Sequence, residues 1–274
     1  MSSRILYTAG KEKKIEQKRR RRIAPFMLII LSGAAIIGGI FAVYRPQWQI
    51  SVVTVRGLRM IPDSAVHESV GRVLAGAYLW IVPHSFILTV RESAVAARIQ
   101  KEFPEIQEIA VHKQFPNRLD IAVTERSLWG IFCNDLMSAA SSTCVAMDAS
   151  GYAYASSPEL TGLLVTRVRS DGADVAVGSS ATDPDTMDRL RILRENLPGA
   201  AGSAPVDFQL RKDMPGEIRV AMPEGYNIIF KHDDDFINAF RVLKKVLDEE
   251  IGDKRTKLDY VDLRFGNKVF YKLK

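Results

Sequence analysis

Few residues of this chain have the types and spacing that metal or acid–base chemistry requires. His67-Glu68 begins like the HExxH motif of zinc proteases, but Val70-Gly71 follows where the second histidine should come. The other histidines are far apart in the sequence: His84, His112 and His232. No Ser-x-x-Lys motif, Gly-x-Ser-x-Gly motif or phosphate-binding loop occurs. These patterns predict a protein that is not an enzyme and that holds neither a metal nor a cofactor.

Three consecutive aspartates, Asp233 to Asp235, could form a cation site or begin a helix. They directly precede a segment whose apolar residues recur at helical spacing: Phe236, Phe240, Leu243, Leu247 and Ile251. Carboxylates at a helix N-terminus complement the positive end of the helix dipole. We therefore predict that these aspartates begin a helix and do not bind a metal.

Two cysteines, Cys133 and Cys144, flank a polar stretch of ten residues. The segments on either side, LWGIF and VAMD, are typical of strands, so the pair would lie at the neck of a hairpin. A disulfide there would close a short loop and stabilise the fold by about 3 kcal/mol in the chain-entropy model. A nucleophilic or metal-bound thiol is the alternative, but the sequence offers it no partner residues.

The positive charge of the chain lies at its N-terminus. Residues 1 to 22 contain nine Lys and Arg against two Glu, a formal balance of +7, whereas the whole chain carries +6. The rest is therefore close to neutral, which argues against a nucleic-acid-binding surface on the folded part.

An uncharged apolar segment, Ile23 to Tyr44, follows the basic tail directly. As a helix it would reach roughly 33 Å, enough to cross a hydrocarbon core of about 30 Å. A cleaved signal peptide is the competing interpretation, but its apolar core should be shorter and should end at a small-x-small site. We predict a single transmembrane helix, with residues 1–22 in the cytoplasm by the positive-inside rule and everything from Arg45 onward outside.

The outer part divides into two α+β regions. Residues 48–126 predict the order β-α-α-β-β, with these elements: a strand from Gln49 to Arg56, helices from Pro62 to about Leu74 and from Ser85 to about Glu102, and strands from Ile106 to Lys113 and from Arg118 to Glu125. Residues 127–274 predict a β-rich domain with flanking helices, one of which opens at Asp183-Pro184. The fold class is therefore α+β, with two helices on one face of a three-stranded sheet in the first region.

The segment KLDYVDLRFGNKVFYKLK predicts a terminal hairpin. Val261, Leu263 and Phe265 alternate with Tyr260, Asp262 and Arg264, as in a half-buried strand. Gly266-Asn267 supplies a two-residue turn before the next strand, Lys268 to Lys274.

This organisation resembles the FtsQ/DivIB bacterial cell-division proteins, which have a cytoplasmic tail, one membrane span, a POTRA domain and a β-rich domain. VVTVRGLRMIPDSAV is similar to the start of such a POTRA domain, and VHKQFPNRLDIAVTER is similar to its closing hairpin. LDYVDLRFGNKVFYK resembles the last strands of the family's β domain. The Cys133/Cys144 pair departs from the family pattern.

The resemblance implies a non-catalytic scaffold of septum assembly in the cell inner membrane, concentrated at the division septum. Its final strands would pair with a bitopic partner of the FtsB type, itself coiled to an FtsL type, by β-augmentation. Carried onto this sequence, the partner-binding residues are Tyr260, Val261, Asp262, Leu263, Arg264, Phe265, Lys268 and Phe270. Which of the two strands forms the free edge stays open at this point.

Two other classes of protein remain as alternatives. A POTRA-bearing component of a protein translocation or outer-membrane assembly system should show several POTRA repeats or a transmembrane barrel. A membrane-anchored cell-wall enzyme should show a pocket with convergent polar groups in the β domain.

Overall fold

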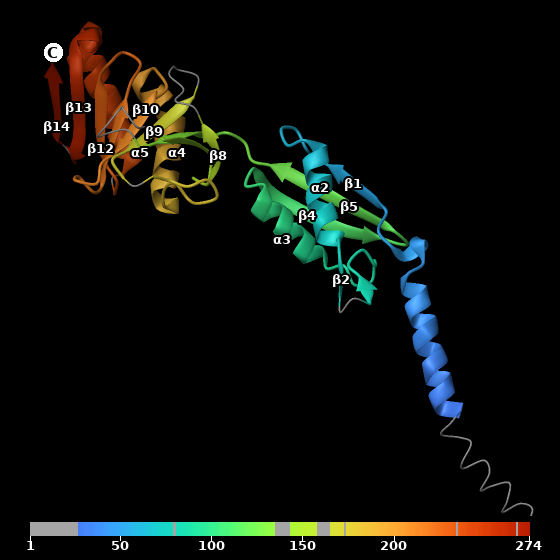
Figure 1. The fold of residues 1–274 in the computed structure, drawn as a ribbon. Coiled ribbons are helices and arrows are strands. Elements are labelled where there is room, and N and C mark those ends of the chain that lie inside the picture. Colours follow the sequence, from blue (N-terminus) through green and yellow to red (C-terminus); the bar gives the residue numbers. More distant parts are fainter. Residues whose placement is uncertain are drawn as a thin grey trace, which may run out of the picture. The chain divides into compact units, whose positions relative to one another are not determined.

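The structure is a computed structural model that describes residues 27–78, 81–134, 143–157, 165–172, 174–233, 235–266 and 268–274 (Figure 1). The predicted cytoplasmic tail and the tip of the cysteine loop lie outside these residues. The chain forms two compact units. Unit 1 comprises residues 1–102 and 109–123, and unit 2 comprises residues 103–108 and 124–274.

Residues 27–43 form a helix within the predicted membrane span, the first four residues of which lie outside the described part. Its large apolar side chains are exposed, among them Leu28, Ile37 and Phe41. None of the helices in the described part of the chain meets the combined length and hydropathy expected of a membrane-crossing segment.

Unit 1 contains most of the three-stranded sheet that the sequence predicts, in the order β1-β5-β4, and the first residues of β4 and the last of β5 are counted with unit 2. Its elements are β1 (Val52–Arg56), α2 (Asp63–Leu74), α3 (Glu92–Glu102), β4 (Ile106–Gln114) and β5 (Arg118–Glu125). β1 runs parallel to β5, with Val52 opposite Arg118. Both helices cover one face of the sheet (Figure 1), because Val66 and Ile99 on the helices and Leu119 and Ile121 on β5 are all buried.

The second helix of unit 1 begins seven residues later than the sequence predicts. Residues 85–91 are not helical because their backbone bonds to the entry segment before β1: Ile50 N–H donates to Ser85 O at 2.8 Å, and Ile87 N–H donates to Trp48 O at 3.0 Å. A small hairpin that the sequence does not predict precedes this segment, formed by β2 (Ala77–Tyr78) and β3 (Val82–Pro83).

Unit 2 is built on one large mixed sheet. Among the described residues its strand order is β14-β13-β12-β11-β10-β9-β6-β7-β8. The strands are β6 (Gly130–Cys133), β7 (Cys144–Met147), β8 (Ala153–Ser157), β9 (Thr166–Ser170), β10 (Asp207–Leu210), β11 (Glu217–Ala221), β12 (Asn227–Lys231), β13 (Leu258–Phe265) and β14 (Lys268–Leu273). β9 and β10 were not predicted from the sequence, and they join the two halves of this sheet.

Two helices cover one face of the large sheet, α4 (Pro184–Ala201) and α5 (Phe236–Lys245). Both begin where the sequence predicts: the Asp183 carboxylate accepts from Thr186 N–H, and the Asp235 carboxylate accepts from the N–H groups of Ile237 and Asn238. A π-helical turn, η3 (Val246–Ile251), and a 3-10 segment, η4 (Gly252–Lys257), lead from α5 to β13.

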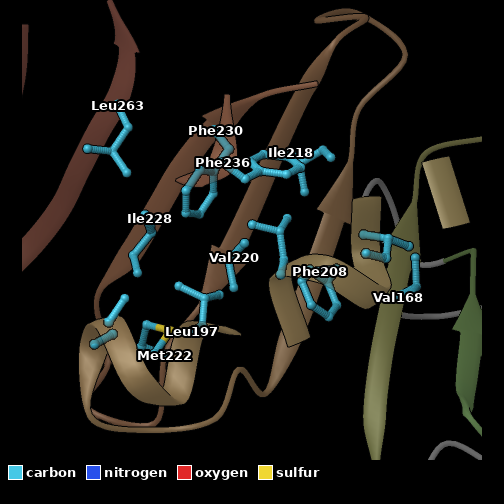
Figure 2. Close-up of a cluster of buried hydrophobic side chains, with 14 of the residues drawn as sticks. Val168, Leu197, Phe208, Ile218, Val220, Met222, Ile228, Phe230, Phe236 and Leu263 are labelled. Atoms are coloured by element: carbon cyan, nitrogen blue, oxygen red, sulfur yellow. The ribbon is translucent and has the colours of Figure 1, made fainter. Parts of the chain in front are cut away.

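The core of unit 2 lies between the sheet and these helices. Figure 2 shows Phe208, Ile218, Ile228 and Phe230 from the strands close to Leu197 of α4 and Phe236 of α5. The ring of Phe230 meets the rings of Phe236 and Phe240 edge-on, with centroids 5.8 and 6.1 Å apart. Leu263 of β13 belongs to the same cluster.

A disulfide closes the hairpin of β6 and β7. Cys133 and Cys144 are directly paired across the two strands, with their Cα atoms 4.2 Å apart and an S–S bond of 2.05 Å. Both cysteines are buried, so the bond lies within the folded unit.

Candidate functional site

The two strands of the terminal hairpin have different positions in the sheet. β13 lies between β12 and β14, and it pairs with β12 in parallel and with β14 in antiparallel orientation. β14 is the outermost strand of the described sheet. Of the two strands that the sequence leaves as candidates for the free edge, β14 is therefore the one that can accept a further strand.

The predicted partner-binding residues on β13 mostly serve the interior of unit 2. Val261 and Leu263 are buried in the core, and Asp262 is buried on the opposite face of the sheet. Tyr260 is half-buried. The backbone of this strand already pairs with β12 and with β14, so β13 cannot accept a further strand and instead holds β14 in the sheet.

Arg264 ties β13 to β11 through two buried carboxylates. Its Nη2 and Nε atoms donate to Asp262 at 2.7 and 2.9 Å, and its Nη1 donates to Glu217. The side chains of Asp262 and Glu217 are only 8% and 4% exposed. Hydrogen bonding to Asp262 is the main cause that raises the pKa of Arg264 above its usual value. Sequence reasoning does not find this contact, because Glu217 lies 47 residues away.

Replacing Arg264 by alanine is expected to destabilise unit 2 by about 2 kcal/mol, because two carboxylates with little solvent exposure lose hydrogen bonds. Arg219 still contacts Glu217, and the Arg264 side chain is 32% exposed, both of which limit the loss. Urea denaturation measures the change, and Arg264→Lys should recover part of it. If Arg264→Ala keeps the urea midpoint of the unchanged protein, Arg264 does not stabilise unit 2.

The exposed side chains of the hairpin are apolar or basic. Phe265 and Phe270 are 55% and 51% exposed and contact one another edge-on, with ring centroids 5.1 Å apart. Tyr271 and Leu273 are also exposed, and alternation along β14 puts them on the face opposite Phe270. Phe265, Lys268 and Phe270 are the predicted site residues that the structure leaves accessible. Tyr271 lies within the second candidate strand, Lys268 to Tyr271, but was not among the chosen site residues. Leu273 was missing from the prediction, although it continues the same β pattern.

Backbone groups of β14 are available at the outer edge. Lys274 N–H donates to Lys257 O at 2.7 Å, so the N–H of residue 274 faces β13. Because successive N–H groups of a strand point to opposite sides, those of Leu273 and Tyr271 face away from β13. These are the donors that an added strand would use.

Two of the lysines on this hairpin are held within the unit. Lys272 Nζ donates to Asp259 at 3.2 Å, and Lys274 Nζ donates to Gly225 O at 3.1 Å. Their positive charges lie beside an edge that could otherwise pair with a second copy of itself, and like charges oppose such pairing.

A separate depression of about 320 Å³ in unit 2 brings a hydroxyl, an imidazole and carboxylates together. His232 Nε2 lies 3.3 Å from Thr186 Oγ1, and His232 Nδ1 lies 3.3 Å from Asp233 Oδ1. Nε2 also lies 3.4 Å from the Asp185 carboxylate, so a hydroxyl and a carboxylate share this nitrogen. In a catalytic triad the corresponding nitrogen faces the hydroxyl alone. Among the described residues, no group of three or more His, Cys, Asp or Glu could hold a metal ion.

Comparison with known proteins matches the first folded domain to a family model. Residues 49–126 match the family model described as POTRA domain, FtsQ-type. Over 113 residues the chain is 26% identical to the cell division protein DivIB of Lacticaseibacillus rhamnosus, a match that spans 41% of this chain and 37% of that protein. The matched domain contains the β1-β5-β4 sheet with its two helices. Residues 49–126 therefore form an FtsQ-type POTRA domain, and part of the chain is similar to a cell division protein DivIB.

Proposed function

We propose that this protein is a non-catalytic scaffold of the bacterial division septum. The observation that carries the proposal is the FtsQ-type POTRA domain at residues 49–126, supported by the similarity to a cell division protein DivIB. Its partners would be other components of the division machinery, and its site of action would be the inner membrane at the septum.

Membrane attachment is part of the proposal. The uncharged segment from Ile23 to Tyr44 follows nine basic residues, and the side chains of Leu28, Ile29 and Ile30 within it are each at least 65% exposed. Exposed apolar side chains in this number favour a lipid environment over water. In this arrangement the tail is cytoplasmic and both folded units lie on the outer side.

Partner capture would occur by strand addition to β14. A segment of an FtsB-type protein, associated with an FtsL-type protein, would bond to the outward N–H and C=O groups of β14. Alternate side chains of the partner would then meet Phe270 on one face and Tyr271 on the other. This mode requires an accessible outermost strand, and β14 meets that requirement.

Replacing Tyr271 by proline tests this mode, because it removes one outward N–H group while edge strands tolerate proline. We expect the affinity of the full-length protein for its FtsB/FtsL-type partners to fall about tenfold or more, equivalent to about 1.4 kcal/mol. Tyr271→Ala is the matched control, since it removes the same side chain but keeps the N–H group. Isothermal titration calorimetry on detergent-solubilised protein measures both.

The outcome depends on the difference between the two variants. Equal affinities for Tyr271→Pro and Tyr271→Ala, with unchanged circular dichroism, would rule out backbone pairing at this position. The division role is tested separately by fluorescence microscopy of a tagged copy. A band at mid-cell supports the role, whereas uniform staining of the envelope contradicts it.

A further inference from the structure

Three segments of unit 1 meet at one end of its sheet. The entry segment, residues 48–52, bonds to Ser85 and Ile87 as described above. It also bonds to the β4–β5 turn, because the N–H groups of Ser51 and Val52 both donate to Asn117 O. Asn117 Nδ2 in turn donates to Ser51 Oγ at 2.9 Å. The start of β1, the 85–90 segment and the β4–β5 turn therefore form one continuous surface, which we call the entry end.

Large apolar side chains project from the entry end. Leu88, directly after Ile87, is 60% exposed, and Phe115 in the β4–β5 turn is 61% exposed. The β2–β3 hairpin adds Tyr78 and Ile81, which are also exposed, and it contacts the 85–90 segment because Phe86 N–H donates to Pro83 O at 3.1 Å. Arg118, the exposed first residue of β5, follows the turn and supplies a positive charge.

Chain length keeps the entry end close to the end of the apolar segment. Trp48 is the fourth residue after Tyr44, and four residues can span at most roughly 14 Å. Three of them, Pro46–Trp48, form a 3-10 turn, which is shorter than an extended chain. The headgroup region on one side of a bilayer is itself roughly 5–8 Å thick. Leu88 and Phe115 lie on segments bonded directly to residues 48–52, so they are within reach of the same bilayer.

We propose that the entry end is a lipid-contacting surface, with Leu88 and Phe115 inserted into the headgroup region of the phospholipid bilayer. This proposal rests on the membrane span of the proposed function. Leucine and phenylalanine enter the boundary between headgroups and acyl chains, tyrosine favours the same depth, and arginine pairs with lipid phosphate. The contact gives the POTRA domain a second attachment to the membrane and restricts its rotation about the chain at residues 45–47.

Single-cysteine labelling of the full-length protein in phosphatidylcholine bilayers tests the proposal. The two native cysteines are bonded to each other, so an added cysteine is the one reactive thiol. Bimane is attached to Leu88→Cys and, separately, to Phe115→Cys. The matched control is Met60→Cys, because Met60 is 79% exposed but follows the opposite end of β1. All three positions are on the surface, and circular dichroism verifies the folding of each variant.

We expect a blue-shifted emission at positions 88 and 115, and a loss of fluorescence when doxyl-labelled phosphatidylcholine is included. The label at position 60 should show neither change. Resistance to alkaline carbonate extraction reports membrane insertion independently. A chain that resists extraction but carries unquenched labels at 88 and 115 overturns the lipid-contacting surface alone. A blue shift without quenching, or one that grows with the protein-to-lipid ratio, means that protein covers the surface and also overturns it. A chain extracted by carbonate overturns the membrane span as well.

Discussion

Replacing Leu263 by proline is expected to unfold unit 2, with a loss of at least about 4 kcal/mol in the free energy of unfolding. The Leu263 side chain is 4% exposed and belongs to the main core cluster. Its strand, β13, is bonded to a neighbour on each side, where proline disrupts the ladder. Because a domain is typically stable by about 5–15 kcal/mol, this loss removes a large part of the total.

Urea denaturation followed by circular dichroism measures this loss, and Leu263→Met serves as the control. Methionine keeps the volume and the N–H group, so its cost should stay below about 1.5 kcal/mol. The proline variant should also lose partner binding, but as a consequence of unfolding. A Leu263→Pro protein that keeps a native urea midpoint would contradict the interior position of β13.

Truncating Phe230 to alanine is expected to cost about 3–5 kcal/mol in the free energy of unfolding. The ring is fully buried on β12 and contacts Phe236 and Phe240, so its removal leaves a cavity and two unfilled ring contacts. Phe236 and Phe240 lie on α5, the helix that leads to β13. The variant should therefore also weaken the packing of α5 against the sheet.

Phe265→Ala is the matched control for Phe230, since it removes the same side chain from a 55% exposed position. Its cost should be below about 1 kcal/mol, because exposed substitutions away from the core change stability little. Thermal or urea denaturation of the two variants under one condition gives the comparison. If both variants lose the same free energy of unfolding, burial of the Phe230 ring does not contribute to the stability of unit 2.

Local patterns in the sequence were sufficient for much of unit 1. Alternation of Leu119, Ile121 and Val123 predicted β5 at its observed bounds, and all three side chains are buried. Pro62 and Asp63 predicted the start of α2. The start of α3 was wrong because hydrogen bonds with residues 48 and 50 and a bridge between Gln49 and Phe86 hold residues 85–87 in a turn outside the helix. Residues 48 and 50 are too far from residues 85–87 in the sequence for helical periodicity to indicate these hydrogen bonds.

At the candidate site, too, only features set by local sequence could be predicted. The alternation correctly predicted that Val261 and Leu263 are buried, because that signal is local. Phe265 of the same set is nevertheless 55% exposed, and Asp262 of the opposite set is buried. Strand order depends on pairing between distant segments, so the outermost place of β14 could not be predicted. For the same reason Arg264 had an expected role in partner contact, whereas the structure pairs it with Glu217 on β11.

The parallel pairing of β12 with β13 has a consequence for when the protein can act. β13 pairs with β12 across a crossover, residues 232–257, that packs α5 onto the core. Pairings between segments far apart in the chain slow folding, because the loop-closure entropy must be overcome first. β14 attaches to β13, so its edge is complete only once the rest of the sheet is assembled. Under the proposed strand addition, a copy whose sheet is incomplete has no β14 edge to offer and cannot bind the partner. Partner binding would therefore select copies in which unit 2 is fully folded.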